Sequence, residues 1–277
     1  VIVAINKMDL VNYSQDVFNN IVIEYAELAR NLGLKDISYI PISALNGDNI
    51  VDKSVHLSWY TGGTLLELLE NVRVEKDINL IHARFPVQYI IRPQTEELHD
   101  YRGYAGKLIS GVYKKGDAIA VLPGGTTSTI SAIEIGGVEV DEAIAPQSIV
   151  IRLHDAIDIS RGDVIVKRND QPEISQDLEV LLCWMDNKPL TAGNRYLIQI
   201  NSTRVRAVVR DLEYKLDVNT LEKQYSPEQA DLNDVVRASI RTALPVAFDT
   251  YQNLRVNGGA ILIDETSNAT VGACMIQ

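Results

Sequence analysis

The chain contains 277 residues, and 37 acidic against 26 basic side chains give it a net charge of −11. This length predicts two domains at about 150 residues each, or three small ones. The acidic balance argues against general binding to the phosphates of nucleic acids. A hydrophobic content of 46% is that of a globular protein and excludes wholesale disorder.

The cysteine content and the start of the chain indicate a compartment. Only Cys183 and Cys274 are present, which favours the reducing cytosol over a disulfide framework, although the two could pair. No apolar run approaches the ~18 residues of a membrane helix, so we expect a soluble protein. The chain begins at Val1 without a charged signal-peptide region, and we expect a further segment upstream of it.

Residues 1–74 alternate between strand and helix patterns. The apolar run at 1–5 predicts a parallel strand covered on both faces, and the run at 37–42 predicts a second strand. A helix is predicted between them, with Ser14 as its N-cap and Gly33 at its end. Its apolar positions recur at helical spacing and are Phe18, Ile21, Val22, Tyr25, Ala29 and Leu32.

A second helix is predicted from Thr64 to Val72, because Thr64 and Glu67 have the spacing of a capping box. A charged linker follows at 74–80, and short strands separated by Gly, Pro and Asp turns then replace the helical pattern. The first series is at 87–91, 107–113, 118–123, 129–135 and 148–153. The second is at 178–185, 196–200, 205–209 and 260–264. Such spacing predicts two antiparallel β-barrels.

Two polar turns follow the two strands of the α/β part. Asn6, Lys7, Met8 and Asp9 follow the first strand, and Ser43 with Ala44 follow the second.

This arrangement suits recognition of guanine. The carboxylate of Asp9 can accept two hydrogen bonds from the ring N–H and exocyclic amine of guanine, a charge-assisted bidentate pair. The stem of Lys7 could cover one face of the base, Asn6 could tie the neighbouring loops, and the N–H of Ala44 could donate to the guanine carbonyl. Adenine would leave that donor unpaired. The alternative interpretation is an ordinary polar turn of an α/β protein.

The phosphate-binding half of a nucleotide site is missing from the sequence. The pattern G-x-x-x-x-G-K-[ST] occurs nowhere in the 277 residues, so no phosphate cradle is assigned. Residues 100–103 have the D-x-x-G pattern of a γ-phosphate switch. They follow the guanine motif and lie in the barrel region, so we interpret them as a strand-to-turn sequence.

Several further stretches match one family of GTPases. They are Leu-Ser-Trp-Tyr at 57–60, Gly-Thr-Leu-Leu-Glu at 63–67, Asp-Tyr-Arg-Gly-Tyr-Ala-Gly at 100–106, Asp-Ile-Ser-Arg-Gly-Asp at 158–163, Trp-Met at 184–185, Lys-Pro-Leu at 188–190, and the closing segments 258–264 and 269–273. With two barrels behind a guanine-reading α/β part, the chain resembles translation-type GTPases of the elongation factor Tu architecture. Within that superfamily it resembles the large GTPase subunit of bacterial heterodimeric sulfate adenylyltransferase. The resemblance covers nearly the whole chain and departs at 145–148 and Cys274.

The resemblance implies a multidomain α/β plus all-β fold. Residues 1–82 would be the C-terminal part of a P-loop GTPase domain with a linker, 83–169 a translation-factor-type β-barrel, and 170–277 a second β-barrel. The first half of the GTPase domain, which in relatives carries the P-loop, magnesium ligands and switches, is absent from the sequence. We therefore expect this chain alone to be inactive as a GTPase.

In the intact protein, the resemblance implies GTP hydrolysis coupled to the synthesis of adenosine 5′-phosphosulfate and pyrophosphate from ATP and sulfate. A separate small catalytic subunit would carry out the synthesis as partner in a heterodimer. The residues carried over as guanine contacts are Asn6, Lys7, Met8 and Asp9, with Ser43 and Ala44 in second rank. No catalytic residue is assigned, and the ligands of the expected Mg²⁺ would lie outside this chain.

Two other functions stay open. A translation elongation factor-type GTPase delivering aminoacyl-tRNA would show salt-sensitive RNA binding, which the acidic charge disfavours. A non-catalytic module would use its barrels only to dock a partner.

The remaining candidate residues have ordinary explanations. His56, His82, His99 and His154 have no partner at metal-ligand spacing, so no metal site is assigned.

Arg204, Arg206 and Arg210 share one face of a predicted strand. We interpret them as a solvated face or an interface with an acidic partner rather than a tRNA site. Trp184 and Met185 are interpreted as barrel core or subunit interface.

Overall fold

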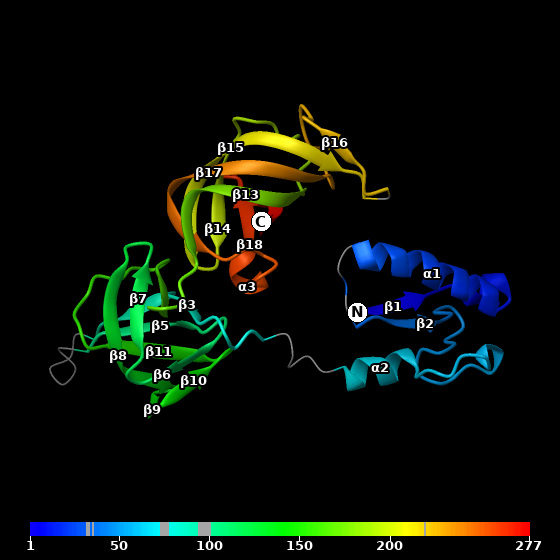
Figure 1. Ribbon diagram of the computed structural model, residues 1–277, viewed down its shortest axis with the longest axis horizontal. Helices are drawn as coiled ribbons and strands as arrows, with labels where there is room; N and C mark the ends of the chain where they lie inside the picture. The colour runs from blue at the N-terminus through cyan, green and yellow to red at the C-terminus, as the bar shows by residue number, and fades with distance from the viewer. Residues whose placement is uncertain (32–33, 35, 73–77, 94–100, 219) are drawn as a thin grey trace. The chain divides into compact units, whose positions relative to one another are not determined.

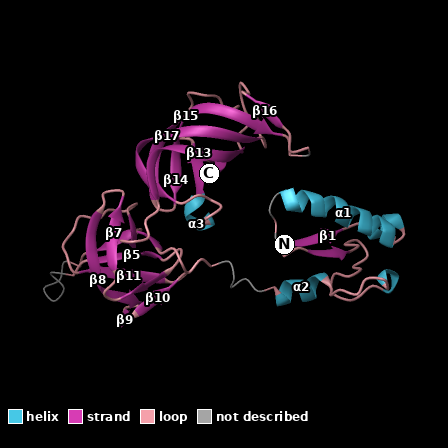
Figure 2. Cartoon of the chain, viewed as in Figure 1, coloured by secondary structure: helices cyan, strands magenta, loops and turns pink. Residues whose placement is uncertain are grey.

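The structure, a computed structural model, describes residues 1–31, 34, 36–72, 78–93, 101–218 and 220–277. The chain forms two compact units, Val1–Lys76 and Asp77–Gln277. The first contains two strands and two helices, and the second is built almost entirely of strands (Figures 1 and 2). No helix in the described part of the chain is long and apolar enough to cross a membrane.

A parallel pair of strands is the centre of the first unit. Strand β1 (Ile2–Ile5) pairs with β2 (Ser38–Pro41) in the register Ile2 to Ser38. Helix α1 (Gln15–Asn31) and helix α2 (Leu65–Asn71) lie on either side of this pair in Figure 1. Two short 3₁₀ turns, η1 (Met8–Val11) and η2 (Val55–Leu57), follow the strands in sequence.

Both helices begin at the predicted caps. The hydroxyl of Ser14 accepts a hydrogen bond from the N–H of Val17 at 3.4 Å. The hydroxyl of Thr64 accepts from the N–H of Glu67 at 3.2 Å, and the Glu67 carboxylate accepts from the N–H of Thr64 at 2.9 Å. These bonds satisfy N–H groups that a helix start leaves free and confirm the capping predictions. The predicted helix end at Gly33 lies outside the described residues, as does most of the linker at 74–80.

The coverage of β1 differs from the prediction of a strand buried on both faces. Ile5 is buried with Met8 and Phe18, and Val3 packs against this small core, but Ala4 is exposed. Within the described residues β1 pairs with β2 alone, so one edge and part of one face remain open. The apolar run predicted the strand correctly and overestimated what covers it.

The first set of antiparallel strands encloses one core. It contains β3 (Arg84–Pro86), β4 (Tyr89–Ile91), β5 (Gly103–Lys107), β6 (Val112–Lys114), β7 (Ala118–Leu122), β8 (Thr126–Ile135), β9 (Val138–Val140), β10 (Glu142–Ile144), β11 (Ser148–Leu153) and β12 (Val164–Lys167). The main sheet has the order β3-β12-β7-β8-β11-β5-β4, β9 pairs with β8, and β6 pairs with β10. Phe85, Tyr104, Tyr113 and Ile165 are buried at its centre. We call this set the first barrel.

The strand predicted at 107–113 is in fact two strands. β5 ends at Lys107 and β6 begins at Val112. Gly111 between them has a φ of 79°, and a Cβ there would lie 2.3 Å from the Cα of Ala83. The chain therefore turns sharply where the apolar pattern alone predicts continuity.

The second barrel closes with six strands. They are β13 (Glu173–Trp184), β14 (Arg195–Ile200), β15 (Thr203–Leu216), β17 (Val235–Phe248), β18 (Gly259–Ile263) and β19 (Thr270–Ile276), with β16 (Lys223–Tyr225) paired to β15 and the short helix α3 (Arg255–Gly258) before β18. The order is β14-β18-β19-β13-β17-β15, and β15 pairs with β14 again. Closure leaves these strands without a free edge.

Trp184 is the largest side chain in the core of the second barrel. It is fully buried, stacks edge-on against Tyr196, and donates its indole N–H to the carbonyl of Lys188 at 2.8 Å. Met185 is exposed, so only Trp184 belongs to the core. Cys183 and Cys274 are both free thiols, and burial raises the pKa of Cys274 to about 12.

A buried polar network, the barrel joint, connects the two barrels. Arg84, 1% exposed, donates from Nε and Nη2 to the two carboxylate oxygens of Asp249, both at 2.9 Å. Its Nη1 lies 3.2 Å from the Asp170 carboxylate. Asn257 donates to Asp249 at 2.8 Å and accepts from Asn201 at 2.8 Å. Apolar contacts beside the joint come from Ala120, Leu122, Val164, Val166 and Ala247.

Candidate functional site

The polar turns after β1 and β2 meet at the same end of the strand pair. The side-chain oxygen of Asn6 accepts hydrogen bonds from the N–H of Lys7 at 2.7 Å and from the N–H of Ala44 at 3.0 Å. The N–H of Met8 donates to the carbonyl of Ile42 at 3.2 Å. Because adjacent parallel strands end side by side, residues 38 positions apart are brought into contact here.

The backbone at Lys7 has an unusual conformation. Its φ of 64° and ψ of 31° lie in the left-handed region, which residues other than glycine adopt rarely. Such conformations persist where the surroundings fix them, and they concentrate at functional sites. The turn exposes the side chain of Lys7 and buries Met8 at 1% exposure, so Met8 anchors the loop while Lys7 faces outward.

The carboxylate of Asp9 is held at one of its two oxygens. The hydroxyl of Ser43, a fully buried residue, donates to Asp9 Oδ1 at 2.6 Å. Asp9 is half-buried, and Oδ2 has no hydrogen-bond partner among the described residues. The carboxylate is thus fixed in orientation and retains capacity to accept further hydrogen bonds.

The N–H of Ala44 is already used in this structure. It donates to Asn6 rather than pointing to an unfilled acceptor position. The sequence assigns this N–H to the guanine carbonyl, so a base would have to share it with Asn6 or use the N–H of Leu45. Leu45 is 87% exposed, and its N–H has no partner within the described residues.

A second layer of polar residues lies next to these loops and was not identified from the sequence. The hydroxyl of Tyr13 donates to Asp48 Oδ2 at 2.7 Å and accepts from the side chain of Asn46 at 3.2 Å. The hydroxyl of Ser54 donates to Asp48 Oδ1 at 2.6 Å. The two hydrogen bonds, from Ser54 and from Tyr13, hold the pKa of Asp48 below its usual value. The only local sign of these loops in the sequence was the presence of Asn12 and Asn46, because asparagine is common in turns.

Three of the four histidines, His56, His82 and His154, lie within the described residues. No group of three or more His, Cys, Asp or Glu side chains in the described part of the chain could hold a metal ion. His56 stacks on Tyr13 with ring centroids 4.8 Å apart, and His82 contacts Asp170 at 2.8 Å. His154 is exposed, and His99 lies outside the described residues.

The arginine stripe of β15 lies on the outside of the second barrel. Arg204 donates to the side chain of Asn268 at 3.2 Å, and Arg206, 78% exposed, lies 3.6 Å from Glu265. Arg210 is also exposed.

The D-x-x-G pattern at 100–103 is only partly visible, because Asp100 lies outside the described residues. Gly103 is buried at the start of β5, in agreement with its interpretation as strand sequence.

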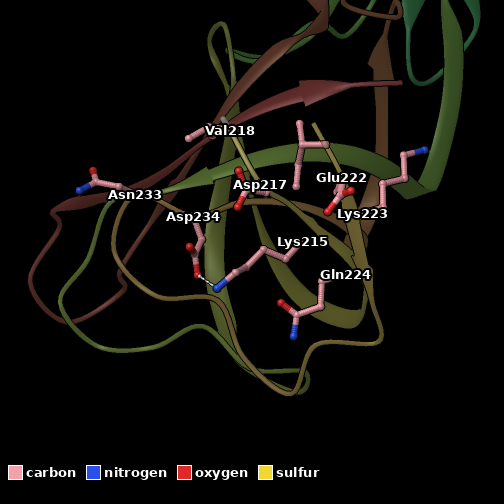
Figure 3. Close-up of a pocket in the computed structure, with 9 residues that line it drawn as sticks. Lys215, Asp217, Val218, Glu222, Lys223, Gln224, Asn233 and Asp234 are labelled. Carbon is pink, nitrogen blue, oxygen red and sulfur yellow. Dashed lines mark hydrogen bonds and ion pairs between the residues drawn. The ribbon is translucent and has the colours of Figure 1, made fainter. Parts of the chain in front are cut away.

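A hollow of the second barrel lies between β15, β16 and the turn before β17. Its volume is about 480 Å³. Figure 3 shows that Lys215 points to Asp234, and their charged atoms are 2.8 Å apart. Lys223 lies 4.4 Å from the ring centre of Tyr214. Both lysines therefore have partners within the protein, and we assign no ligand to this hollow.

Comparison with known proteins identifies relatives of the chain. The chain is 45% identical over 278 residues to sulfate adenylyltransferase subunit 1 of Aliarcobacter butzleri, covering 100% of this chain and 58% of that protein. It is 44% identical over 276 residues to the bifunctional enzyme CysN/CysC of Mycobacterium tuberculosis, covering 99% of this chain and 45% of that protein. Over its whole length the chain is thus similar to part of proteins named sulfate adenylyltransferase subunit 1.

Two further comparisons concern the fold of the chain. Residues 177–277 match the family described as GTP-eEF1A C-terminal domain-like, which covers the second barrel. The crystal structure of Sup35 complexed with GMPPNP aligns with a TM-score of 0.65 at 23% identity, covering 99% of this chain and 68% of that one. The chain thus shares its fold with this Sup35 structure. It spans 58% and 45% of the two curated relatives, about half of their length.

Proposed function

We propose that the loops after β1 and β2 read the guanine base in a GTP-binding regulatory subunit of sulfate adenylyltransferase. The single observation that carries this proposal is the Asp9 carboxylate. It is oriented by the buried hydroxyl of Ser43 at 2.6 Å, and its other oxygen has no hydrogen-bond partner among the described residues, in a chain 45% identical to a sulfate adenylyltransferase subunit 1.

The chemistry of the site fits guanine better than adenine. A fixed carboxylate accepts two parallel hydrogen bonds from neighbouring N–H groups, and guanine presents such a pair at its ring N–H and exocyclic amine. The exposed stem of Lys7 supplies an apolar surface for one face of the base. Asn6 keeps the two loops at a constant separation through the N–H groups of Lys7 and Ala44.

The proposed partner is the small catalytic subunit, which joins ATP and sulfate into adenosine 5′-phosphosulfate and pyrophosphate. The name of the relative, subunit 1, supports a second subunit. GTP hydrolysis in the complete protein would supply free energy for this uphill reaction through conformational steps. Among the described residues, no group of three or more His, Cys, Asp or Glu side chains could hold Mg²⁺.

The test uses the complete gene product with its small subunit. Pyrophosphate release from ATP and sulfate is measured against GTP concentration for the wild type, for Asp9→Asn, and for the control Asp16→Asn, an exposed residue of α1. We expect GTP to stimulate release and Asp9→Asn to raise the required GTP concentration about 100-fold, because two charge-assisted hydrogen bonds are lost. Asp16→Asn should behave as the wild type.

A second nucleotide makes the test specific for the base. Xanthosine triphosphate carries a carbonyl where guanine carries its exocyclic amine, so the amide introduced by Asp9→Asn can donate to it. This variant should therefore prefer xanthosine over guanosine triphosphate. Sulfate-dependent pyrophosphate release that never responds to GTP would contradict the regulatory role. An unchanged base preference in Asp9→Asn would contradict the guanine site.

A further inference from the structure

A closed circuit of hydrogen bonds joins the two loops behind the Asp9 carboxylate. The Ser43 hydroxyl donates to Asp9 at 2.6 Å, and the Ser43 N–H donates to the carbonyl of Asp48 at 3.2 Å. The Asp48 carboxylate accepts from the Tyr13 hydroxyl at 2.7 Å. The Tyr13 N–H donates to the carbonyl of Met8 at 2.8 Å, and Met8 precedes Asp9 in the chain.

The tyrosine in this circuit is fixed on three sides. Its carbonyl accepts from the indole N–H of Trp59 at 2.9 Å. Its ring stacks on His56 with an interplanar angle of 16°, and its hydroxyl also accepts from Asn46 at 3.2 Å. Because these contacts leave Tyr13 little freedom to move, it can hold the two loops in a fixed position relative to each other.

The backbone of the same segment is strained. Asn12 and Tyr13 have φ values of 51° and 53°. Asparagine tolerates the left-handed region, but an aromatic residue adopts it rarely. The contacts of the Tyr13 ring, hydroxyl and backbone are what hold it there, which is the behaviour expected of a residue placed for function.

We propose that Tyr13 and Asp48 are positioning residues for the base-reading carboxylate. They fix the separation between the turn that carries Asp9 and the loop that carries Ser43, so that the Ser43 hydroxyl stays bound to one oxygen of Asp9. This keeps both carboxylate oxygens in line for the paired donors of guanine. The inference rests on the proposed function, in which Asp9 binds the base.

The protonation states support the circuit. Hydrogen bonds from Ser54 and Tyr13 lower the pKa of Asp48, so its carboxylate is ionised at neutral pH. The hydrogen bond to Asp48 raises the pKa of Tyr13, so the phenol keeps the proton that it donates. Both shifts result from hydrogen bonding, and they keep the donor protonated and the acceptor ionised in a charge-assisted bond.

The decisive measurement compares two bases in the full-length protein. Dissociation constants for GDP and for inosine diphosphate are measured by calorimetry. Hypoxanthine lacks the exocyclic amine and makes one hydrogen bond to the carboxylate where guanine makes two. The ratio of the two constants therefore reports how well both oxygens of Asp9 are aligned, whereas general damage to the fold would weaken both nucleotides alike.

Two variants break the circuit and two controls match them. Tyr13→Phe removes the hydroxyl and keeps the ring on His56, and Asp48→Asn removes the charge. The controls are Tyr25→Phe, whose hydroxyl has no partner among the described residues, and the exposed Asp52→Asn. We expect Tyr13→Phe and Asp48→Asn to weaken GDP about threefold to tenfold, as for one lost hydrogen bond, and inosine diphosphate by about twofold or less. The controls should leave the ratio unchanged.

The variant Asp9→Asn separates failure of this inference from failure of the proposed function. If Asp9→Asn leaves the ratio unchanged, Asp9 does not read the base and the proposed function itself fails. If Asp9→Asn collapses the ratio while Tyr13→Phe and Asp48→Asn both preserve it, the positioning role is overturned. In the Asp9→Asn background, Tyr13→Phe should have no further effect on the ratio.

Discussion

The loops after β1 and β2 and the barrel joint are both networks built around carboxylates, yet they differ in how completely the protein satisfies them. In the joint, Arg84 is 1% exposed and the carboxylate of Asp249 is 12% exposed, with both of its oxygens bound. In the loops, Asp9 is half-buried and one oxygen has no partner among the described residues. Clustering of polar groups is therefore common to both, and only the loops retain free capacity for a ligand.

The two networks also differ in the groups that balance the carboxylates. A guanidinium lies between Asp249 and Asp170 in the joint, whereas hydroxyl groups of Ser43, Ser54 and Tyr13 serve in the loops. Removing a buried cation leaves charge without compensation, whereas water can replace a lost hydroxyl at the half-buried Tyr13 and Ser54. Breaking the joint should thus cost stability, and breaking the loops should cost binding.

The largest effect is expected from Arg84→Met. It leaves the partly buried carboxylates of Asp249 and Asp170 without the guanidinium that joins them, so the free energy of unfolding of the second unit should fall by about 3–5 kcal/mol. Urea denaturation followed by circular dichroism measures this. The exposed Arg168→Met is the control and should stay within about 0.5 kcal/mol of the wild type. A loss below about 1 kcal/mol for Arg84→Met would show that the joint is not a buried ion pair.

Asn6→Ala should show the opposite behaviour. It removes the acceptor for the N–H groups of Lys7 and Ala44, and water can reach both donors, so we expect about a tenfold loss of GDP affinity in the full-length protein. The unfolding of the second unit should not change. Asn19→Ala, at an exposed position of α1, is the control. Equal GDP affinities for Asn6→Ala and Asn19→Ala would show that Asn6 does not contribute to nucleotide binding.

The smallest effect is expected from acid. Burial alone would raise the pKa of Asp170, but hydrogen bonds from His82 and Arg84 outweigh it and lower the pKa. Because the folded-state value lies below the unfolded value of about 3.9, this stabilisation is present above that pH and is lost as the pH falls through the folded value. The urea midpoint of the second unit should therefore drop from pH 5 to pH 3.

Asp170→Asn isolates this contribution. The slope of the urea midpoint against pH should be shallower in Asp170→Asn than in the wild type, whereas the exposed Asp141→Asn should retain the wild-type slope. Identical slopes in all three proteins would assign the acid sensitivity to other carboxylates.

Local features of the fold were predictable because each has a local cause. The helix after Ser14 and the capping box at Thr64 follow from spacing alone, and both are confirmed. The pairing of β15 with β14, which closes the second barrel, depends on contacts across the sheet that no short pattern contains. At Gly111, between β5 and β6, the close approach of Ala83 leaves no room for a side chain. Ala83 is 28 positions away in the sequence, so an apolar pattern cannot reveal this contact.

The candidate site also contains residues that local sequence patterns reveal and residues that only the folded structure reveals. Asp9 and Ser43 stood out because each follows a strand, and parallel strands bring their ends together. Tyr13 and Asp48 carried no such signal, since a tyrosine before a helix and an aspartate in a loop have many ordinary explanations. Their contact, 2.7 Å across 35 positions, appears only when both loops are folded.

The position of β19 has a consequence for biosynthesis. This strand, at 270–276, lies between β18 and β13, so the second barrel cannot close while the ribosome still holds its residues. Until then β13 and β18 each present an unpaired edge, a template for association with other chains. A chaperone that protects this barrel during translation would therefore be needed most while β19 is being made, and slow codons for residues 270–276 would prolong the exposure.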